Sequence, residues 1–334
     1  MNFNTKVMDI VKGGTFNVLG RPYFVNDVPA FTWSNSGIEF CAKCDRITVF
    51  FGENPAEQPA IFKIYVDGIE VKASVAGKGT TAMIENLRDK MHKVKILRIS
   101  EGSYCVSVLK VQIYGKAPEF SLPAEKMRLK LEFLGDSITA GFGVLADGEK
   151  MEYTTYEQDS TKTYAYLTAE ALDAEIRTIC ISGEGICHSC GDMVGTPFIR
   201  FFNRTCRGVE GYTPDDFVPD IFVVNGGTND KRTHVTSEEF IEGVITLLKD
   251  IRSKYPETPI IWMYGMMVHV FDEELKAAVN QFNKTDKNTH CLIVKSVNDY
   301  KNQRGTYGHP NVNASVRCAG ILKRKILEVL SLNR

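Results

Sequence analysis

The first third of the chain carries short apolar runs in which hydrophobic and polar positions often alternate. The runs span 47–51, 61–66, 69–71, 93–99 and 105–113. They are rich in β-branched residues, which is typical of strands, and the Asp67-Gly68 pair between two of them is a hairpin signal. Because no convincing helix lies between the runs, they predict a β-sandwich of Greek-key or jelly-roll type.

After residue 128 the pattern changes to apolar runs that alternate with amphipathic helical segments. The runs span 129–134, 177–181, 220–224, 260–264 and 292–294. We expect Ser237 to cap a helix whose apolar residues recur at helical spacing up to Ile251, and a last helix to run from Ala314 to Leu330. Strands that alternate with helices form buried parallel sheets with right-handed crossovers. The pattern therefore predicts a three-layer α/β/α domain with a five-stranded parallel sheet.

A segment with two prolines, Pro118 and Pro123, separates the two patterns. Such segments are typical of linkers between domains. The length of 334 residues also suits roughly two domains. We predict a β-sandwich domain at 1–118, a linker at 119–127 and an α/β domain at 128–334.

The charge balance argues against partners that are bound by a basic surface. Forty Lys and Arg face 41 Asp and Glu, which gives a net charge of −1, and no run of basic residues gathers the charge. We therefore expect neither nucleic acid nor a membrane as a partner. The first residues lack a positive start followed by an apolar stretch, and no 18 consecutive residues are apolar, so we expect a cytoplasmic protein.

Nine cysteines, an odd number, are spread over the chain, and we expect them to be reduced. Two pairs, Cys41/Cys44 and Cys187/Cys190, have the spacing of zinc ligands. However, the first pair lies on a strand-like run, where residues three apart point to opposite faces. We therefore predict no metal site, and the chemistry considered below needs no cofactor.

Residue types suited to catalysis follow four of the predicted parallel strands. Ser137 follows the first, Gly183 the second and Asn229 the third, while His309 lies past the fifth, just before the last helix. Ligands of open parallel sheets bind at the carboxyl ends of the strands, so these residues are expected to meet at one edge.

A hydroxyl, an imidazole and several amide donors are what acyl transfer requires. Ser137 would be the nucleophile, and His309 would accept its proton. The amides of Ser137 and Gly183 and the side chain of Asn229 would form the oxyanion hole. Each motif alone is usually a turn or a strand-to-helix connection, but their order and placement together favour the catalytic interpretation.

The four residues Ser137, Gly183, Asn229 and His309 match the markers of the SGNH (GDSL-type) hydrolase superfamily, which the second half resembles. With a preceding β-sandwich and the segments 31–40 and 181–186, the whole chain is similar to carbohydrate esterase family 2. The resemblance implies a jelly roll followed by a flavodoxin-like SGNH domain. It also implies an acetyl xylan esterase-like activity that removes O-acetyl groups from plant polysaccharides.

One position departs from the superfamily pattern. Many members have an aspartate three residues before the histidine, whereas this chain has Thr306. A hydroxyl does not stabilise an imidazolium as a buried carboxylate does. Some members of the family work with a Ser-His dyad whose imidazole is held by a main-chain carbonyl, and we expect the same here. Asp299 is an alternative partner for the imidazole.

The sequence therefore favours an esterase that acts on acetylated xylo-oligosaccharides or related oligosaccharides. A short-chain acyl esterase, lipase or thioesterase of the same superfamily is the first alternative. A non-catalytic carbohydrate-binding protein is an alternative of another class. A nucleotide binder is disfavoured because no phosphate-binding loop motif is present. The sequence leaves assembly into a homo-oligomer open.

Overall fold

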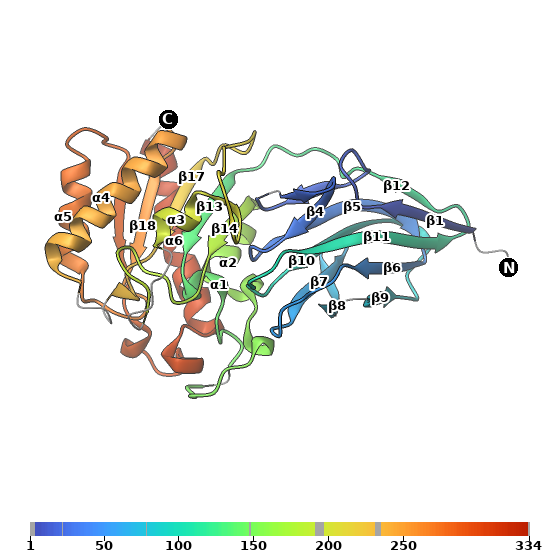
Figure 1. Cartoon of the computed structure of the whole chain (residues 1–334), viewed down its shortest axis with the longest axis horizontal. Coiled ribbons are helices and arrows are strands. Elements are labelled where there is room, and N and C mark those ends of the chain that lie inside the picture. The colour runs from blue at the N-terminus through green and yellow to red at the C-terminus, as the bar shows by residue number, and fades with distance from the viewer. Residues whose placement is uncertain are drawn as a thin grey trace. The chain divides into compact units, whose positions relative to one another are not determined.

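The computed structural model describes residues 4–332, except 22, 78, 147, 191–196 and 231–234. The chain forms two compact units (Figure 1). The first comprises Met1–Met127 and Thr205–Val209, and the second comprises Arg128–Arg204 and Glu210–Arg334. The domain limits at 118 and 128 stay a prediction.

The first unit is a sandwich of two antiparallel sheets. One sheet has the order β3-β4-β11-β6-β9 with β1 on β11, and the other has the order β12-β5-β10-β7-β8 with β2 on β5. The strands are β1 (Asn4–Asp9), β2 (Asn17–Leu19), β3 (Phe24–Val25), β4 (Val28–Phe31), β5 (Ser36–Cys44), β6 (Arg46–Phe51), β7 (Ala60–Val66), β8 (Ile69–Ala76), β9 (Thr81–Ile84), β10 (Lys90–Arg98), β11 (Val106–Gly115) and β12 (Glu119–Ser121).

The alternation seen in the sequence gives each sheet one buried face. Ile38, Phe40 and Ala42 of β5 are buried and pack in one core with Val94 and Ile96 of β10. The sandwich predicted from the sequence is confirmed. Strand β12 lies inside the segment that we expected to be a linker, and it pairs with β5.

The second unit holds a five-stranded parallel sheet with the order β14-β13-β17-β18-β19. The predicted α/β half is confirmed. Its principal elements are β13 (Lys130–Gly135), α1 (Ser137–Ala140), α2 (Tyr164–Ala171), β14 (Glu175–Cys180), α3 (Phe198–Phe202), β17 (Ile221–Asn225), α4 (Ser237–Lys254), β18 (Ile260–Tyr264), α5 (Asp272–Phe282), β19 (Thr289–Ile293) and α6 (Val312–Leu332). A two-stranded hairpin, β15 (Arg204–Cys206) and β16 (Val209–Glu210), follows α3 in the chain, and its segment Thr205–Val209 belongs to the first unit.

Helices cover both faces of the parallel sheet because its strands are apolar on both sides. On one face, Leu131 and Phe133 of β13 share a core with residues of α2 and α6. On the other face, Phe222 of β17 packs against Phe202 of α3 and Tyr255 at the end of α4, with ring centroids 5.4 and 5.8 Å apart. This is the predicted three-layer arrangement.

The start of α4 differs from the prediction in one detail. Thr236, not Ser237, is the N-cap, because its hydroxyl accepts a hydrogen bond from the Glu239 amide while the Glu239 carboxylate accepts one from the Thr236 amide. This reciprocal capping box satisfies two amides at once, which a single serine cap would not do. Within the described part of the chain, no helix combines the length and the apolar character needed to cross a membrane.

Candidate active site

The strand order places three of the predicted site residues at one edge of the sheet. Strand β13 is followed in the chain by β14 on one side and then by β17 on the other, so the order reverses around β13. Ser137 follows β13, Gly183 follows β14 and Asn229 follows β17, all at carboxyl ends. A reversal of this kind creates the crevice in which such sheets bind ligands.

The structure brings Ser137 and His309 into direct contact although 172 residues separate them. His309 Nε2 lies 2.8 Å from Ser137 Oγ, and Nδ1 lies 3.0 Å from the main-chain oxygen of Thr306. A carbonyl oxygen can only accept a hydrogen bond, so Nδ1 must carry the proton. In the neutral ring, Nε2 is then the acceptor for the serine hydroxyl.

Asp136 and Gly135 shape the turn that presents Ser137. Asp136 caps α1, and its Oδ1 accepts a hydrogen bond of 2.9 Å from the Ile138 amide. A Cβ on Gly135 would come within 2.0 Å of Thr139 Oγ1, so only glycine fits this tight turn. Thr139 is in turn held by the Tyr164 hydroxyl at 2.9 Å. Ser137 therefore sits on a buried, hydrogen-bonded support.

Asn229 lies beside the same turn. Its Nδ2 donates to the Glu184 carbonyl at 2.8 Å and points a second hydrogen toward Asp136 Oδ2 at 3.4 Å. The longer contact is weak, which leaves that hydrogen able to serve another acceptor. Gly183 immediately precedes Glu184 and has a φ of +83°, a conformation that side chains disfavour.

Asp230 is a site residue for which we predicted no role. Its carboxylate is fully buried and accepts hydrogen bonds from the amides of Ile186, Cys187 and His188 at 2.9, 2.8 and 3.3 Å. Burial raises the pKa of Asp230, although the amide hydrogen bonds act in the opposite direction. Asp230 thereby connects the end of β17, next to Asn229, to the loop that begins at Gly183. Its only signal in the sequence was its position beside Asn229.

The loop that carries His309 is supported differently. The Thr306 hydroxyl donates to Glu157 Oε2 at 3.1 Å, and Glu157 also forms an ion pair with Lys150. Burial raises the pKa of Glu157, but these two contacts lower it more, so the net shift is downward. Asp299, the alternative partner of the imidazole, accepts a hydrogen bond from the Ser296 amide instead.

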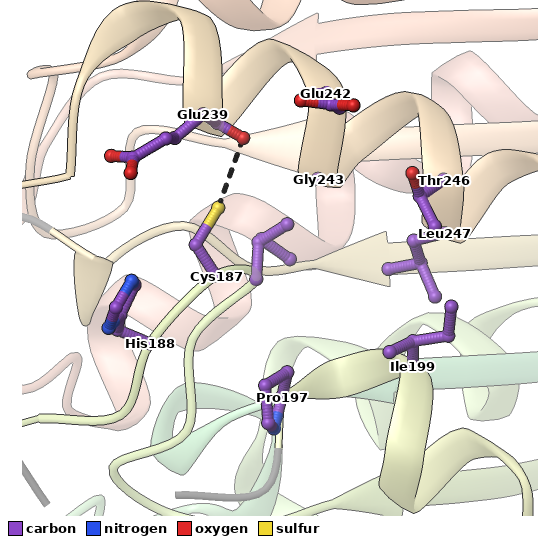
Figure 2. Close-up of a pocket in the computed structure, with 10 residues that line it drawn as sticks. Cys187, His188, Pro197, Ile199, Glu239, Glu242, Gly243, Thr246 and Leu247 are labelled. Atoms are coloured by element: carbon purple, nitrogen blue, oxygen red, sulfur yellow. Dashed lines mark hydrogen bonds between the residues drawn. The ribbon is translucent and has the colours of Figure 1, made fainter. Parts of the chain in front are cut away.

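A cavity of about 350 Å³ is lined by the loop segment that Asp230 holds and by helix α4 (Figure 2). The segment Ile186–His188 faces Glu239 and Gly243 of α4 across it, and Cys187 Sγ donates to the Glu239 carbonyl at 3.3 Å. Ser137, Asn229 and His309 do not line this cavity. Burial raises the pKa of the Cys187 thiol to about 12, so the thiol is protonated at neutral pH.

Two family models match the chain. Residues 133–290 match the GDSL-like Lipase/Acylhydrolase family. Residues 18–118 match the Carbohydrate esterase 2 N-terminal family. The second half of the chain is thus similar to GDSL-type hydrolases and the first to the N-terminal module of family two carbohydrate esterases, and the resemblance predicted from the sequence is confirmed.

Individual curated proteins and solved structures are also similar to this chain. The chain is 26% identical to the Cellulase/esterase CelE of Acetivibrio thermocellus over 72% of its length, and 25% identical to an acetylxylan esterase / glucomannan deacetylase of Cellvibrio japonicus over 60%. It spans 30% and 56% of the length of these two relatives. A family two carbohydrate esterase from Clostridium thermocellum, solved in complex with cellohexaose, has a TM-score of 0.81 at 24% identity, covering 95% of this chain and 99% of that one.

Proposed function

We propose that this protein is a serine esterase that removes O-acetyl groups from acetylated xylo-oligosaccharides or related oligosaccharides. The observation that carries the proposal is the 2.8 Å contact between Ser137 Oγ and His309 Nε2, with Nδ1 held by a main-chain carbonyl. A serine hydroxyl in contact with an unprotonated imidazole nitrogen is an activated nucleophile.

In the proposed reaction, Ser137 Oγ attacks the acetyl carbonyl carbon while His309 Nε2 takes the hydroxyl proton. The tetrahedral intermediate collapses when the C–O bond to the sugar breaks, and His309 returns the proton to the leaving sugar oxygen. A water molecule then repeats the sequence on the acetyl-serine. It gives its proton to Nε2, and acetate leaves as Ser137 recovers its hydrogen.

The negative oxygen of each intermediate needs hydrogen-bond donors that are already in place. We assign this role to the main-chain amides of Ser137 and Gly183 and to Asn229 Nδ2. The support for Asn229 is its weakly engaged second hydrogen, and the support for Gly183 is the connection of its loop to Asn229 through Glu184.

The proposed substrate class rests on the relatives. One is named cellulase/esterase, another is named acetylxylan esterase / glucomannan deacetylase, and a structural neighbour was solved in complex with cellohexaose. The name acetylxylan esterase / glucomannan deacetylase covers two polysaccharide backbones, so we propose an acetylated sugar hydroxyl, rather than one backbone, as the common element.

Acetate release from acetylated xylo-, manno- and gluco-oligosaccharides tests the proposal. Acetyl, butyryl and octanoyl p-nitrophenyl esters are compared in parallel, with Ser137→Ala as the inactive control. We expect acetate release from at least one oligosaccharide and a steep loss of activity beyond acetyl. Preference for octanoyl esters would support a lipase or thioesterase. Oligosaccharide binding without any Ser137-dependent hydrolysis would support a non-catalytic binding protein.

A further inference from the structure

Helix α4 carries a glycine, Gly243, in its interior. The helix spans Ser237–Lys254, so Gly243 lies well away from both ends. Glycine in a helix interior costs about 1 kcal/mol relative to alanine, because it loses more backbone freedom on folding. Gly243 has no positive φ that would require glycine. A residue that weakens its own helix without a backbone reason is expected to serve packing or function.

The space above Gly243 is filled by the loop that follows β14. A Cβ on Gly243 would lie 2.8 Å from Cys187 Sγ and 3.1 Å from Ile186 Cγ2. The same thiol donates to the Glu239 carbonyl, one helical turn earlier, at 3.3 Å (Figure 2). Atoms in favourable contact are about 3.5–4.0 Å apart, so a methyl group at this position would displace the loop side chains. Gly243 therefore lets the loop lie directly on the helix.

Cys187 lies in the middle of a closed turn that begins at Gly183. The Cys190 amide donates to the Gly183 carbonyl at 2.6 Å, which closes the turn. Within it, the amides of residues 186–188 donate to the buried carboxylate of Asp230. A turn held at its base and at its centre moves as one body, so a displacement of Cys187 is passed on to Gly183.

The inner side of this turn leaves no room to absorb a displacement. A Cβ on Gly185 would lie 2.0 Å from the His188 carbonyl oxygen and 2.7 Å from Asp230 Oδ2. The main chain of the turn is thus already packed against itself and against the carboxylate. Helix α4 forms the opposite wall, and Gly243 is the point at which this wall meets Cys187.

We propose that Gly243 is a positioning residue of the oxyanion hole: its missing side chain sets how closely the turn 183–190 docks on α4 and thereby places the Gly183 amide. The proposal rests on the proposed esterase function, since the placement of this amide affects turnover only if it receives the oxyanion. Gly243 contacts no reacting atom and acts through Cys187. A misplacement of about 1 Å in a catalytic group can cost on the order of 100-fold, so one added methyl group should cost less than that.

Gly243→Ala separates positioning from a purely structural role. We expect kcat for p-nitrophenyl acetate to fall about tenfold with KM within about twofold, because the displaced donor acts in the transition state. The Tm should stay within about 3 °C of wild type, because the gain in helix propensity offsets the cost of moving the loop. Unchanged kcat would overturn the proposal. A Tm lower by more than about 10 °C would also overturn it, since Gly243 would then serve stability.

Gly320→Ala is the matched control. Gly320 lies inside α6, and a Cβ there would meet only Arg324 Nη1, at 3.9 Å. This variant makes the same chemical change in a helix that has room for it, so kcat should equal that of wild type. An equal loss of kcat in Gly320→Ala and Gly243→Ala would contradict a specific role for Gly243.

Removal of the Cys187 sulfur tests the route through which Gly243 acts. In a Cys187→Ala background the closest atom to the new methyl group is gone, so adding Gly243→Ala should lower kcat by less than about twofold. A loss as large as that in the wild-type background would show that the effect does not pass through Cys187, and would overturn the proposal.

Hydrogen exchange of the full chain, followed by mass spectrometry, supplies a readout that is independent of catalysis. We expect the amides of residues 183–190 to exchange at least about threefold faster in Gly243→Ala than in wild type. The double variant should exchange like Cys187→Ala. Unchanged exchange in Gly243→Ala would overturn the placement of the turn by Gly243. Faster exchange in a protein whose wild type shows no Ser137-dependent hydrolysis would overturn the proposed function instead, and Gly243 would still place the turn.

Discussion

The two sides of the proposed active site are held in different ways. On the side of the nucleophile and the oxyanion hole, two fully buried carboxylates, Asp136 and Asp230, accept hydrogen bonds from main-chain amides. On the side of the base, the imidazole of His309 contacts the main-chain carbonyl of Thr306. The nearest carboxylate in that network, Glu157, is one hydrogen bond further away, on the Thr306 side chain.

The difference shows where side-chain charge is used in this site. A carboxylate that accepts hydrogen bonds from several main-chain amides fixes the position of their loop. Here the carboxylates fix the loops that carry the proposed oxyanion-hole amides. A carbonyl that accepts one N–H fixes the tautomer and orientation of a ring but adds no full negative charge. We therefore expect substitutions beside the proposed oxyanion hole to lower turnover when they remove a carboxylate or an amide. Loss of the Thr306 hydroxyl, beside the proposed base, should instead leave turnover nearly unchanged.

The largest effect is expected from the reacting pair itself. Ser137→Ala and His309→Ala should each lower kcat by at least about 10⁴-fold, because either change removes the activated nucleophile. The double variant should be no worse than either single one, since the two groups act as a unit. Turnover numbers with an acetyl ester measure this, and circular dichroism checks the fold. Additive losses would contradict a shared step.

Asn229→Ala should have the next largest effect. Losing one oxyanion donor typically costs about 10²–10³ in turnover, with little change in KM. Asn298→Ala, at an exposed asparagine whose Nδ2 donates to the Met267 carbonyl, is the control and should remain active. If Asn229→Ala kept wild-type turnover, the donor would have to be assigned elsewhere.

Asp230→Asn should lower kcat about tenfold, because the loop that carries Gly183 would shift when three amides lose a charged acceptor. It should also lower stability by about 1–3 kcal/mol. The control is Asp299→Asn, which changes a carboxylate that accepts a main-chain amide but lies outside the oxyanion loop. Kinetics and urea unfolding measure both effects. Equal losses in the two variants would contradict a specific role for Asp230.

The smallest effect is expected at Thr306. Thr306→Ala removes the hydroxyl but keeps the carbonyl that holds Nδ1, so turnover should stay within about threefold of wild type. Thr306→Ser, which keeps the hydrogen bond to Glu157, should match wild type. A collapse in Thr306→Ala comparable to that in His309→Ala, with recovery in Thr306→Ser, would show that Glu157 orients the base through this hydroxyl.

The fold was largely predictable because it depends on local patterns. Alternating apolar residues predicted β10 and β11, and continuous apolar runs predicted β17 and β18, since buried parallel strands are apolar on both faces. Short strands such as β3 and β12 were not predicted. They span two and three residues, too few for a period to be visible, and they form only because a neighbouring strand offers free main-chain groups.

The site was predictable as far as it follows strand ends, and less so beyond them. The meeting of Ser137 and His309 follows from topology, because parallel strands bring their carboxyl ends to one edge. The role of Asp230 depends on its contacts with the loop at 186–188, which lies 42 to 44 residues earlier in the chain. The residues of the Thr306–Glu157 contact are 149 residues apart. Such contacts between irregular segments leave no periodic pattern in the sequence.

Labelling with a fluorophosphonate probe, followed by intact-mass and peptide analysis, shows whether Ser137 is an activated nucleophile. We predict one label per chain, on Ser137, no label in Ser137→Ala, and much slower labelling in His309→Ala. Labelling of folded Ser137→Ala at the wild-type level would contradict the proposed role of Ser137.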